Sequence, residues 1–182
     1  MAPEPQVFIS YRRDDAPVHA GRLYDGLVYA IGKSQVFFDL GSIGGGAKFA
    51  EVIAEALGRT DVVLAVIGPA WLTMVDGRGA RRLDDPDDFV RRELASALRR
   101  NAPVVPVLVN GAVMPDRGEL PTALMGLADR QAERLNDGVE FAEDVHGRLL
   151  DRMRALAVEE FARRARAAGG PRLGGVFGPF RL

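Results

Sequence analysis

The stretch "VVLAVI", residues 62 to 67, decides the fold that we expect for this chain. All of its residues are apolar, most are β-branched, and turn residues follow it in "GPA" at 68 to 70. A second run, "VVPVLV" at residues 104 to 109, has the same character. Because the apolarity is continuous rather than alternating, both runs are typical of parallel strands that helices cover on both faces.

Shorter segments complete the predicted sheet, and helical patterns lie between the strands. Apolar runs at 7–9 and 36–38 predict two further strands, and residues 132–135 predict a short fifth one. The helical patterns cover residues 16–32, 48–59, 85–100 and about 141–168. Strands that alternate with helices predict a doubly wound α/β sheet, mostly parallel, with right-handed crossovers.

Two of the predicted helices carry signals at their ends. Gly32 follows the first helical pattern and predicts its C-terminal stop. Asp85 or Asp87 is the predicted N-cap of the third helix, with Pro86 early in its first turn.

Composition limits the classes of function. The chain has 182 residues, which predicts one compact domain, and a net charge of -1, which gives no overall field that would attract nucleic acid or an anionic membrane. It has no cysteine, which excludes disulfides and thiolate chemistry and fits a reducing compartment. Only two histidines are present, which argues against a histidine-based metal site. The N-terminus lacks a signal-peptide pattern, and no apolar stretch approaches the length of a membrane helix.

The ends of the chain differ in composition from its middle. We assign residues 1–5 to an N-terminal extension, 6–165 to the domain and 166–182 to a flexible tail rich in glycine, proline and arginine, with the change clearest at Gly169. The tail's Phe177 and Phe180 either dock on a partner or belong to a disordered end.

Polar side chains follow the predicted strands where a site is expected. The first strand runs directly into Ser10, Tyr11, Arg12 and Arg13 in "VFISYRRDD", residues 7 to 15. Ligands of doubly wound sheets bind beyond the carboxyl ends of the strands. This rule places segments 10–13, 39–46, 68–71 and 110–114 around one rim.

The glycine-rich stretch "GSIGGGAKF", residues 41 to 49, lies at the same rim. It does not match the phosphate-binding loop pattern, because Lys48 follows Ala47 and precedes Phe49. It also lacks the G-x-G-x-x-G spacing of the dinucleotide fingerprint. The stretch is either a loose loop that gates a pocket or contacts another subunit, or only a long turn.

Each candidate site residue has a structural alternative. Glu93 falls within the apolar stripe of the third helix, so it either faces a cleft or pairs with Arg99, Arg100 or a strand-end arginine. Arg12 and Arg13 either bind phosphates or pair with Asp14, Asp15 or Asp39. Trp71, the only tryptophan, either stacks on a flat ring or packs in the core.

Six segments in order resemble the TIR domain family over about residues 5 to 155. These are "VFISYRRDD", "AGRLYDGL", "VFFDLGSIGGGAKFAEVIAEAL", "DVVLAVIGPAWL", "DDPDDFVRRELASAL" and "VVPVLVNGAVMP". The resemblance implies the TIR fold, a flavodoxin-like three-layer sandwich around a five-stranded, mostly parallel sheet. Some family members are scaffolds that relay signals by assembly, and others cleave NAD at the nicotinamide–ribose bond.

The resemblance also assigns roles to residues. Glu93 matches the family's catalytic glutamate, and Phe89 stands where several enzymatic relatives have tryptophan. The residues that match the NAD-binding cleft are Ser10, Tyr11, Arg12, Arg13, Phe38 and Asp39, and Trp71 lies near the expected base-stacking wall. The residues that match the BB loop, through which enzymatic members assemble, are Ser42, Ile43, Gly44, Gly45, Gly46 and Lys48.

We therefore expect a cytoplasmic bacterial enzyme that takes NAD+ as its substrate, needs no metal or cofactor and self-associates through TIR contacts. A carboxylate such as Glu93 can offset the oxocarbenium-like charge that develops when nicotinamide leaves. The products would be nicotinamide with ADP-ribose or a cyclic ADP-ribose, in antiphage defence or another signalling pathway that involves an effector or sensor protein. The alternatives are a non-enzymatic scaffold and an N-glycosidase of nucleosides or nucleotides.

Overall fold

The structure is a computed structural model that describes residues 4–38 and 47–168, with side chains from residue 51 onward in the second range. Its strands are β1 (Val7–Ser10), β2 (Val36–Phe38), β3 (Val62–Ile67), β4 (Val104–Leu108) and β5 (Glu133–Arg134). Its α-helices are α1 (Pro17–Ile31), α2 (Ala47–Arg59), α3 (Phe89–Arg99), α4 (Glu140–Asp144) and α5 (Leu150–Ala167). Short 3-10 turns are η1 (Lys33–Gln35), η3 (Arg82–Asp84), η4 (Arg117–Glu119) and η5 (Thr122–Leu127), and η6 (Val145–Leu149) is a π-helical turn.

The strands form one parallel sheet in the order β2-β1-β3-β4-β5. This order is that of the flavodoxin-like folds, which bind their ligands where the order of the strands reverses. In this sheet the reversal lies between β1 and β3. The predicted fold class is confirmed, and so is the short fifth strand.

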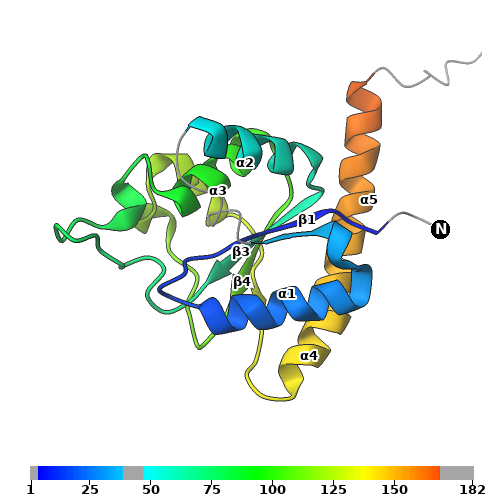
Figure 1. Cartoon of the computed structure of the whole chain (residues 1–182), viewed down its shortest axis with the longest axis horizontal. Helices are drawn as coiled ribbons and strands as arrows, with labels where there is room; N and C mark the ends of the chain where they lie inside the picture. The colour runs from blue at the N-terminus through cyan, green and yellow to red at the C-terminus, as the bar shows by residue number, and fades with distance from the viewer. Residues whose placement is uncertain (1–3, 39–46, 169–182) are drawn as a thin grey trace, which may run out of the picture.

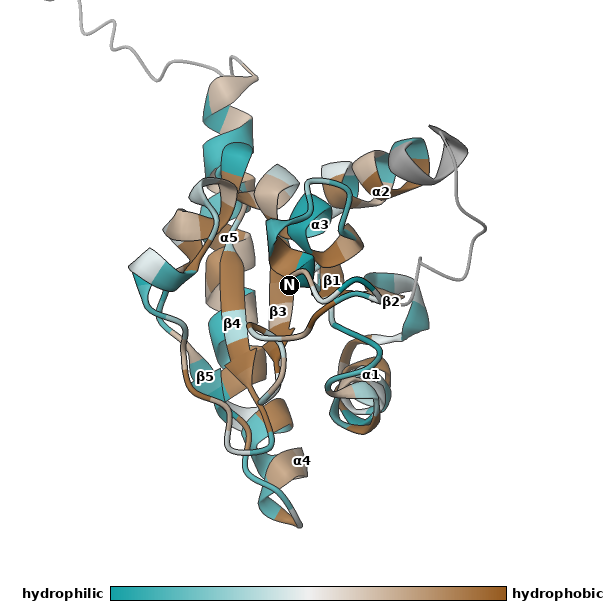
Figure 2. Ribbon diagram, turned by 90° about the vertical axis from the view of Figure 1, so that its left-hand side faces the viewer, coloured by the Kyte–Doolittle hydropathy of each residue, from teal (hydrophilic) through white to brown (hydrophobic). Residues whose placement is uncertain are grey.

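Two hydrophobic cores lie on opposite faces of the sheet, with α1 and α5 on one face and α2, α3 and η5 on the other. Side chains alternate between these cores along each strand, as the period of a strand requires. In β1, Val7 and Ile9 pack on the α1 side, whereas Phe8 packs on the α3 side. Figure 1 shows the helices around the sheet, and Figure 2 shows β3 and β4 as hydrophobic ribbons at the centre.

The helix ends confirm one prediction and correct another. Gly32 ends α1 with a φ of 90°, which a glycine adopts without strain. The N-cap of α3 is Asp88 rather than Asp85 or Asp87, and Pro86 lies before the helix instead of in its first turn. Asp88 accepts a hydrogen bond from the backbone N–H of Arg91 at 3.0 Å.

The last helical segment is one continuous stretch from Glu140 to Ala167, with the π-helical turn η6 between α4 and α5. The helix ends at Ala167, one residue before its predicted end at about 168, so residues 166 and 167 are helical although the domain assignment placed them in the tail; residues 169–182 lie outside the described range. Figure 1 shows α5 continuing beyond the sheet. None of the helices among the described residues is long and apolar enough to cross a bilayer.

An ion cluster around the buried Glu160 joins α5 to the start of β3. Glu160, 3% exposed, accepts hydrogen bonds from Arg163 and Arg164, and Arg164 also donates to Asp61 and to the carbonyl of Thr60. Burial acts to raise the pKa of Glu160, but the hydrogen bonds and charges of the two arginines outweigh it and lower that pKa below its ordinary value. The cluster therefore holds an ionised carboxylate in the helix–sheet interface.

Candidate functional site

A cavity of about 240 Å³ opens at the carboxyl end of β1. Its walls come from β1 and the loop after it, from η3 and from the first turns of α3. The lining residues are Phe8, Ile9, Tyr11, Arg12, Arg13, Asp14, Arg82, Asp88, Phe89, Val90 and Glu93. The polar cluster in "VFISYRRDD" therefore forms one wall of a cavity, at the end of the sheet where ligands of this fold class bind.

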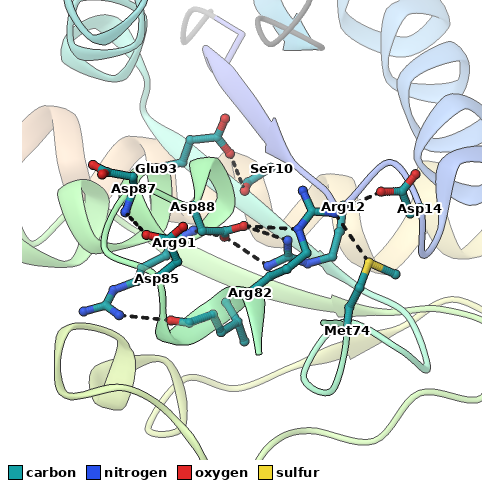
Figure 3. Close-up of polar contacts among 11 residues, drawn as sticks. Ser10, Arg12, Asp14, Met74, Arg82, Asp85, Asp87, Asp88, Arg91 and Glu93 are labelled. Atoms are coloured by element: carbon teal, nitrogen blue, oxygen red, sulfur yellow. Dashed lines mark hydrogen bonds and ion pairs between the residues drawn. The ribbon is translucent and has the colours of Figure 1, made fainter. Parts of the chain in front are cut away.

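Glu93 brings a carboxylate to this cavity from the buried face of α3. It is 9% exposed and shares that face with Val90, Leu94 and Ala97. Ser10 follows Phe8 at strand spacing, so its side chain also points to the α3 side of the sheet. The Ser10 hydroxyl donates a hydrogen bond of 2.6 Å to Glu93 Oε2, as Figure 3 shows. The carboxylate is thereby fixed between an apolar layer and the cavity.

Arg12 is held in a way that the sequence did not predict. Its guanidinium donates two hydrogen bonds to the Asp88 carboxylate, at 2.8 and 3.0 Å, and the two side chains are 1% and 5% exposed. The sequence had suggested Asp14, Asp15 or Asp39 as the partner of Arg12, whereas both of these bonds go to Asp88. Arg12 lines the cavity, but its two terminal nitrogens are engaged by Asp88.

Asp88 is the residue of this site that sequence reasoning missed. It caps α3 and binds Arg12 with the same carboxylate, so it fastens the first turn of α3 to the loop after β1. With the hydrogen bond from Ser10 to Glu93, it forms a second link between β1 and α3. The run "DDPDD" offers several aspartates as the N-cap of α3. The apolar stripe of the helix begins at Phe89, and this signal could have identified the aspartate directly before it as the cap.

Arg82 was also missed, and it supplies a partly exposed cation to the cavity. Its guanidinium donates to Asp14 at 2.9 Å and lies 3.7 Å from Asp88, with the side chain 33% exposed. It also contacts the sulfur of Met74 at 3.7 Å (Figure 3). The exposed Arg13 lines the same cavity. Among the arginines of the cavity, Arg82 and Arg13 are thus the two that reach solvent.

Two aromatic candidates lie away from this cavity. Phe38 stacks between Tyr11 and Tyr24, with ring centroids 5.0 and 4.8 Å apart, on the α1 side of the sheet. Trp71 is 1% exposed and packs in the core on the α3 side. Neither residue lines the cavity with Glu93. In this arrangement Trp71 follows the packing alternative and does not offer a stacking face.

Phe89 stands at the mouth of the cavity. It is the first residue of α3, is 44% exposed and lines the cavity beside Glu93, one turn further along the helix. A flat apolar ring next to a carboxylate is suited to contact a planar cationic group. The structure therefore brings Phe89 together with Glu93 in one cavity.

Several predicted residues fall outside the described side chains. Asp39, Ser42, Ile43, Gly44, Gly45 and Gly46 lie outside the described residues, and Lys48 is described only as part of the backbone of α2.

Asp15 accepts hydrogen bonds from the backbone N–H groups of Gly68 and Ala70, at 2.9 and 2.7 Å. It joins the loops after β1 and β3, the two strands between which the order reverses.

The arrangement is suited to stabilise positive charge on a bound sugar. A fixed carboxylate, an apolar ring and two solvent-accessible guanidinium groups can hold the ribose, the base and the phosphates of a nucleotide, respectively. Within residues 4–38 and 47–168 no group of three or more His, Asp or Glu side chains is arranged to hold a metal ion.

The family assignment rests on a comparison of the whole chain with known families. A sequence model of the TIR domain family matches residues 7–150, and no curated protein matches the chain. Among solved structures, a metazoan TIR-STING receptor from C. gigas in complex with 2',3'-cGAMP is similar to it, with 19% sequence identity and a TM-score of 0.49. That similarity covers 92% of this chain and 47% of the other, so the chain spans about half the length of the receptor. Because the family match extends over most of its length, the chain belongs to the TIR domain family.

Proposed function

We propose that this TIR domain cleaves NAD+ at the bond between nicotinamide and ribose, with Glu93 as its catalytic residue. The observation that carries the proposal is the position of Glu93: a carboxylate at 9% exposure that lines the cavity and accepts a 2.6 Å hydrogen bond from Ser10. Family membership supports the same reaction, because many TIR domains catalyse it.

The chemistry follows from the charge that develops in the reaction. Nicotinamide leaves with the electron pair of the glycosidic bond, and the ribose then acquires oxocarbenium-like charge. The Glu93 carboxylate stabilises that charge and accepts hydrogen bonds from the ribose hydroxyls. Attack by water gives ADP-ribose, and attack by the adenine ring of the same molecule gives a cyclic ADP-ribose.

The substrate phosphates are assigned to Arg13 and Arg82, because Arg12 is engaged by Asp88. Arg81 provides a matched control for Arg82. It is adjacent in sequence, 30% exposed against 33%, and paired with Asp84, but it does not line the cavity. Arg82→Met is expected to raise KM for NAD+ about tenfold through the loss of one charge-assisted contact. Arg81→Met is expected to leave KM unchanged, and equal effects of the two changes would remove this assignment.

The decisive experiment is incubation of the protein with NAD+ and identification of the products by mass. The wild type is compared with Glu93→Gln, which keeps the size of the side chain but removes its charge, and with Glu159→Gln on the exposed side of α5 as a control. We expect nicotinamide release by the wild type and the control, and a loss of at least about a hundredfold for Glu93→Gln. Full activity of Glu93→Gln would refute the role of the carboxylate.

We further infer that the protein acts in the cytoplasm of a bacterium, in antiphage defence or a related nucleotide-signalling pathway, and as an assembly. In enzymatic TIR domains, the BB loop of one protomer completes the site of its neighbour. The specific activity should therefore rise with protein concentration. Constant activity per molecule across the concentrations at which self-association is measured would argue for a monomeric enzyme, and assembly without any turnover would identify a scaffold.

The cavity of a single protomer is also large enough to raise a second candidate, a nucleotide N-glycosidase. About 240 Å³ lies below the range of roughly 300–1,000 Å³ that is typical of drug-sized ligands. A nucleoside monophosphate is smaller than a dinucleotide and needs the same carboxylate chemistry. Comparison of kcat/KM for NAD+ with that for nucleoside monophosphates separates the two reactions, and a preference for the monophosphates would favour the second.

A further inference from the structure

A second concave site lies on another face of α3, between this helix and α2. Its volume is about 380 Å³, which falls within the range that ligand pockets occupy. Figure 1 shows the two helices next to each other on the same side of the sheet. We refer to this site as the α2–α3 groove.

The groove carries positive charge on an apolar floor. Its charged lining residues are Arg91, Arg92 and Arg99, and among the described residues no aspartate or glutamate lines it. Its apolar lining comes from α2, α3 and η5: Ile53 is buried at its base, and Ala54 and Ala123 are exposed along its sides. A concave surface with one sign of charge raises the local concentration of oppositely charged ligands.

The spacing of the polar residues suits a compact anion. Arg92, Ser96 and Arg99 follow each other at intervals of four and three residues, so they lie along one face of α3. The two guanidinium groups therefore flank the serine hydroxyl along the helix. Positions 92 and 99 are about 10.5 Å apart along the helix axis, and both long side chains can reach toward Ser96, where they and the hydroxyl can contact the same phosphate group.

Two of these arginines are available to a ligand. Arg92 and Arg99 are exposed, and no described residue makes an ion pair or side-chain hydrogen bond with them. Arg91, in contrast, donates to the backbone carbonyls of Leu83 and Asp84 at 3.1 and 2.8 Å. Arg91 thus holds η3 against α3, whereas Arg92 and Arg99 make no ion pair or side-chain hydrogen bond with the described residues.

We propose that the α2–α3 groove binds a phosphate-bearing small molecule of nucleotide size. The phosphates lie on Arg92, Ser96 and Arg99, and the flat or apolar part of the ligand rests on the floor next to Ile53. This site differs from the cavity of Glu93, because neighbouring positions of a helix such as 92 and 93 point about 100° apart. The proposal does not depend on NAD+ cleavage.

The test is a binding titration of the full chain with three probes: pyrophosphate, ADP and adenosine. The groove variant is Arg92→Gln/Arg99→Gln, and the control is Arg78→Gln/Arg166→Gln, which removes the same charge from exposed arginines that do not line the groove. Because Arg13 and Arg82 are assigned to phosphates in the cavity of Glu93, both pairs of changes are also made in Arg82→Met. We expect ADP and pyrophosphate to bind Arg82→Met, and this binding to weaken at least about tenfold when the groove changes are added but not when the control changes are added. Adenosine should bind more weakly than ADP to the wild type.

Three outcomes would overturn the proposal. The first is no binding of either phosphate probe to the wild type. The second is an equal loss in the groove variant and the control, which would indicate a general effect of net charge. The third is a loss in Arg82→Met but not in the groove variant, which would place the anion in the cavity of Glu93. Thermal unfolding of the groove variant and of its control should match the wild type, because the four substituted arginines are exposed.

Discussion

The buried pair of Arg12 and Asp88 offers a quantitative test of how the site is held together. Asp88→Ala removes two charge-assisted hydrogen bonds, at 2.8 and 3.0 Å, and leaves a guanidinium at 1% exposure without its counter-ion. Breaking a buried pair in this way costs about 3–5 kcal/mol. The N-cap of α3 is lost as well, at a cost of about 1 kcal/mol. The sum approaches the whole stability of a typical domain, which is about 5–15 kcal/mol.

A double-mutant cycle separates the ion pair from the cap. Asp88→Asn keeps an N-cap oxygen but removes the charge, so it should cost about 1 kcal/mol less than Asp88→Ala. Arg12→Met removes the cation and keeps much of the apolar volume. If the pair is what stabilises the contact, Arg12→Met/Asp88→Asn should be more stable than the sum of the single costs predicts, by about 2–3 kcal/mol.

Urea unfolding measures these costs, and tryptophan fluorescence can follow it because Trp71 is the only tryptophan and is 1% exposed. Its fluorescence reports the loss of the α3-side core, and far-UV circular dichroism reports the helices. Asp88→Ala should lower the midpoint of thermal unfolding by about 10–20 °C. Additive costs in the double variant, or a cost below about 1 kcal/mol for Asp88→Ala, would refute the reasoning.

Three further predictions concern activity, pH and packing. Ser10→Ala removes the 2.6 Å hydrogen bond to the α3 carboxylate and should lower kcat about tenfold with little change in KM; an unchanged kcat would show that the bond has no catalytic effect. Glu160→Gln should lower the free energy of unfolding by about 1–3 kcal/mol near neutral pH. Because the pKa of Glu160 is depressed in the folded state, this difference should be complete above the ordinary pKa of 4.5 and should be lost as the pH falls through the lower pKa of the folded state; urea midpoints that differ equally at all pH values would contradict this. Gly68→Ala would place a Cβ atom 2.5 Å from the Asp15 carboxylate, so it should destabilise the fold by about 1–3 kcal/mol, whereas Gly21→Ala meets no atom within 4 Å and should not; equal thermal midpoints would contradict it.

The sheet could be predicted because its strands are short and continuously apolar. The residues 62–67 form β3 as predicted, and the run at 104–109 forms β4 with its last residue left out. Local hydrophobicity fixes such strands, since both of their faces are buried in any parallel arrangement. The end of α1 was predictable for an equally local reason, the positive φ of Gly32.

The charged residues could not be predicted in the same way. The stripe of α3 placed Glu93 on a buried face, but no pattern in the sequence says which of the many carboxylates pairs with Arg12. That partner is set by the docking of α3 on β1, which brings together residues 76 positions apart. Trp71 shows the same limit, because the sequence pattern of a tryptophan that follows a strand is the same whether its side chain faces a cavity or, as here, packs in the core.

The two kinds of arginine in the cavity explain how a rigid site can still bind a charged substrate. A phosphate that drew Arg12 away would leave the Asp88 carboxylate, 5% exposed, without its main counter-ion. Such a loss costs about 3–5 kcal/mol, so this phosphate would bind more than about a hundredfold more weakly than one that left Arg12 in place. Arg82 is 33% exposed, and its partner Asp14 is 70% exposed, so that pair contributes at most about 1 kcal/mol and can exchange for a phosphate. Arg12 therefore fixes the helix that carries Glu93, and the recognition of the substrate's phosphates falls to cations that remain in contact with water.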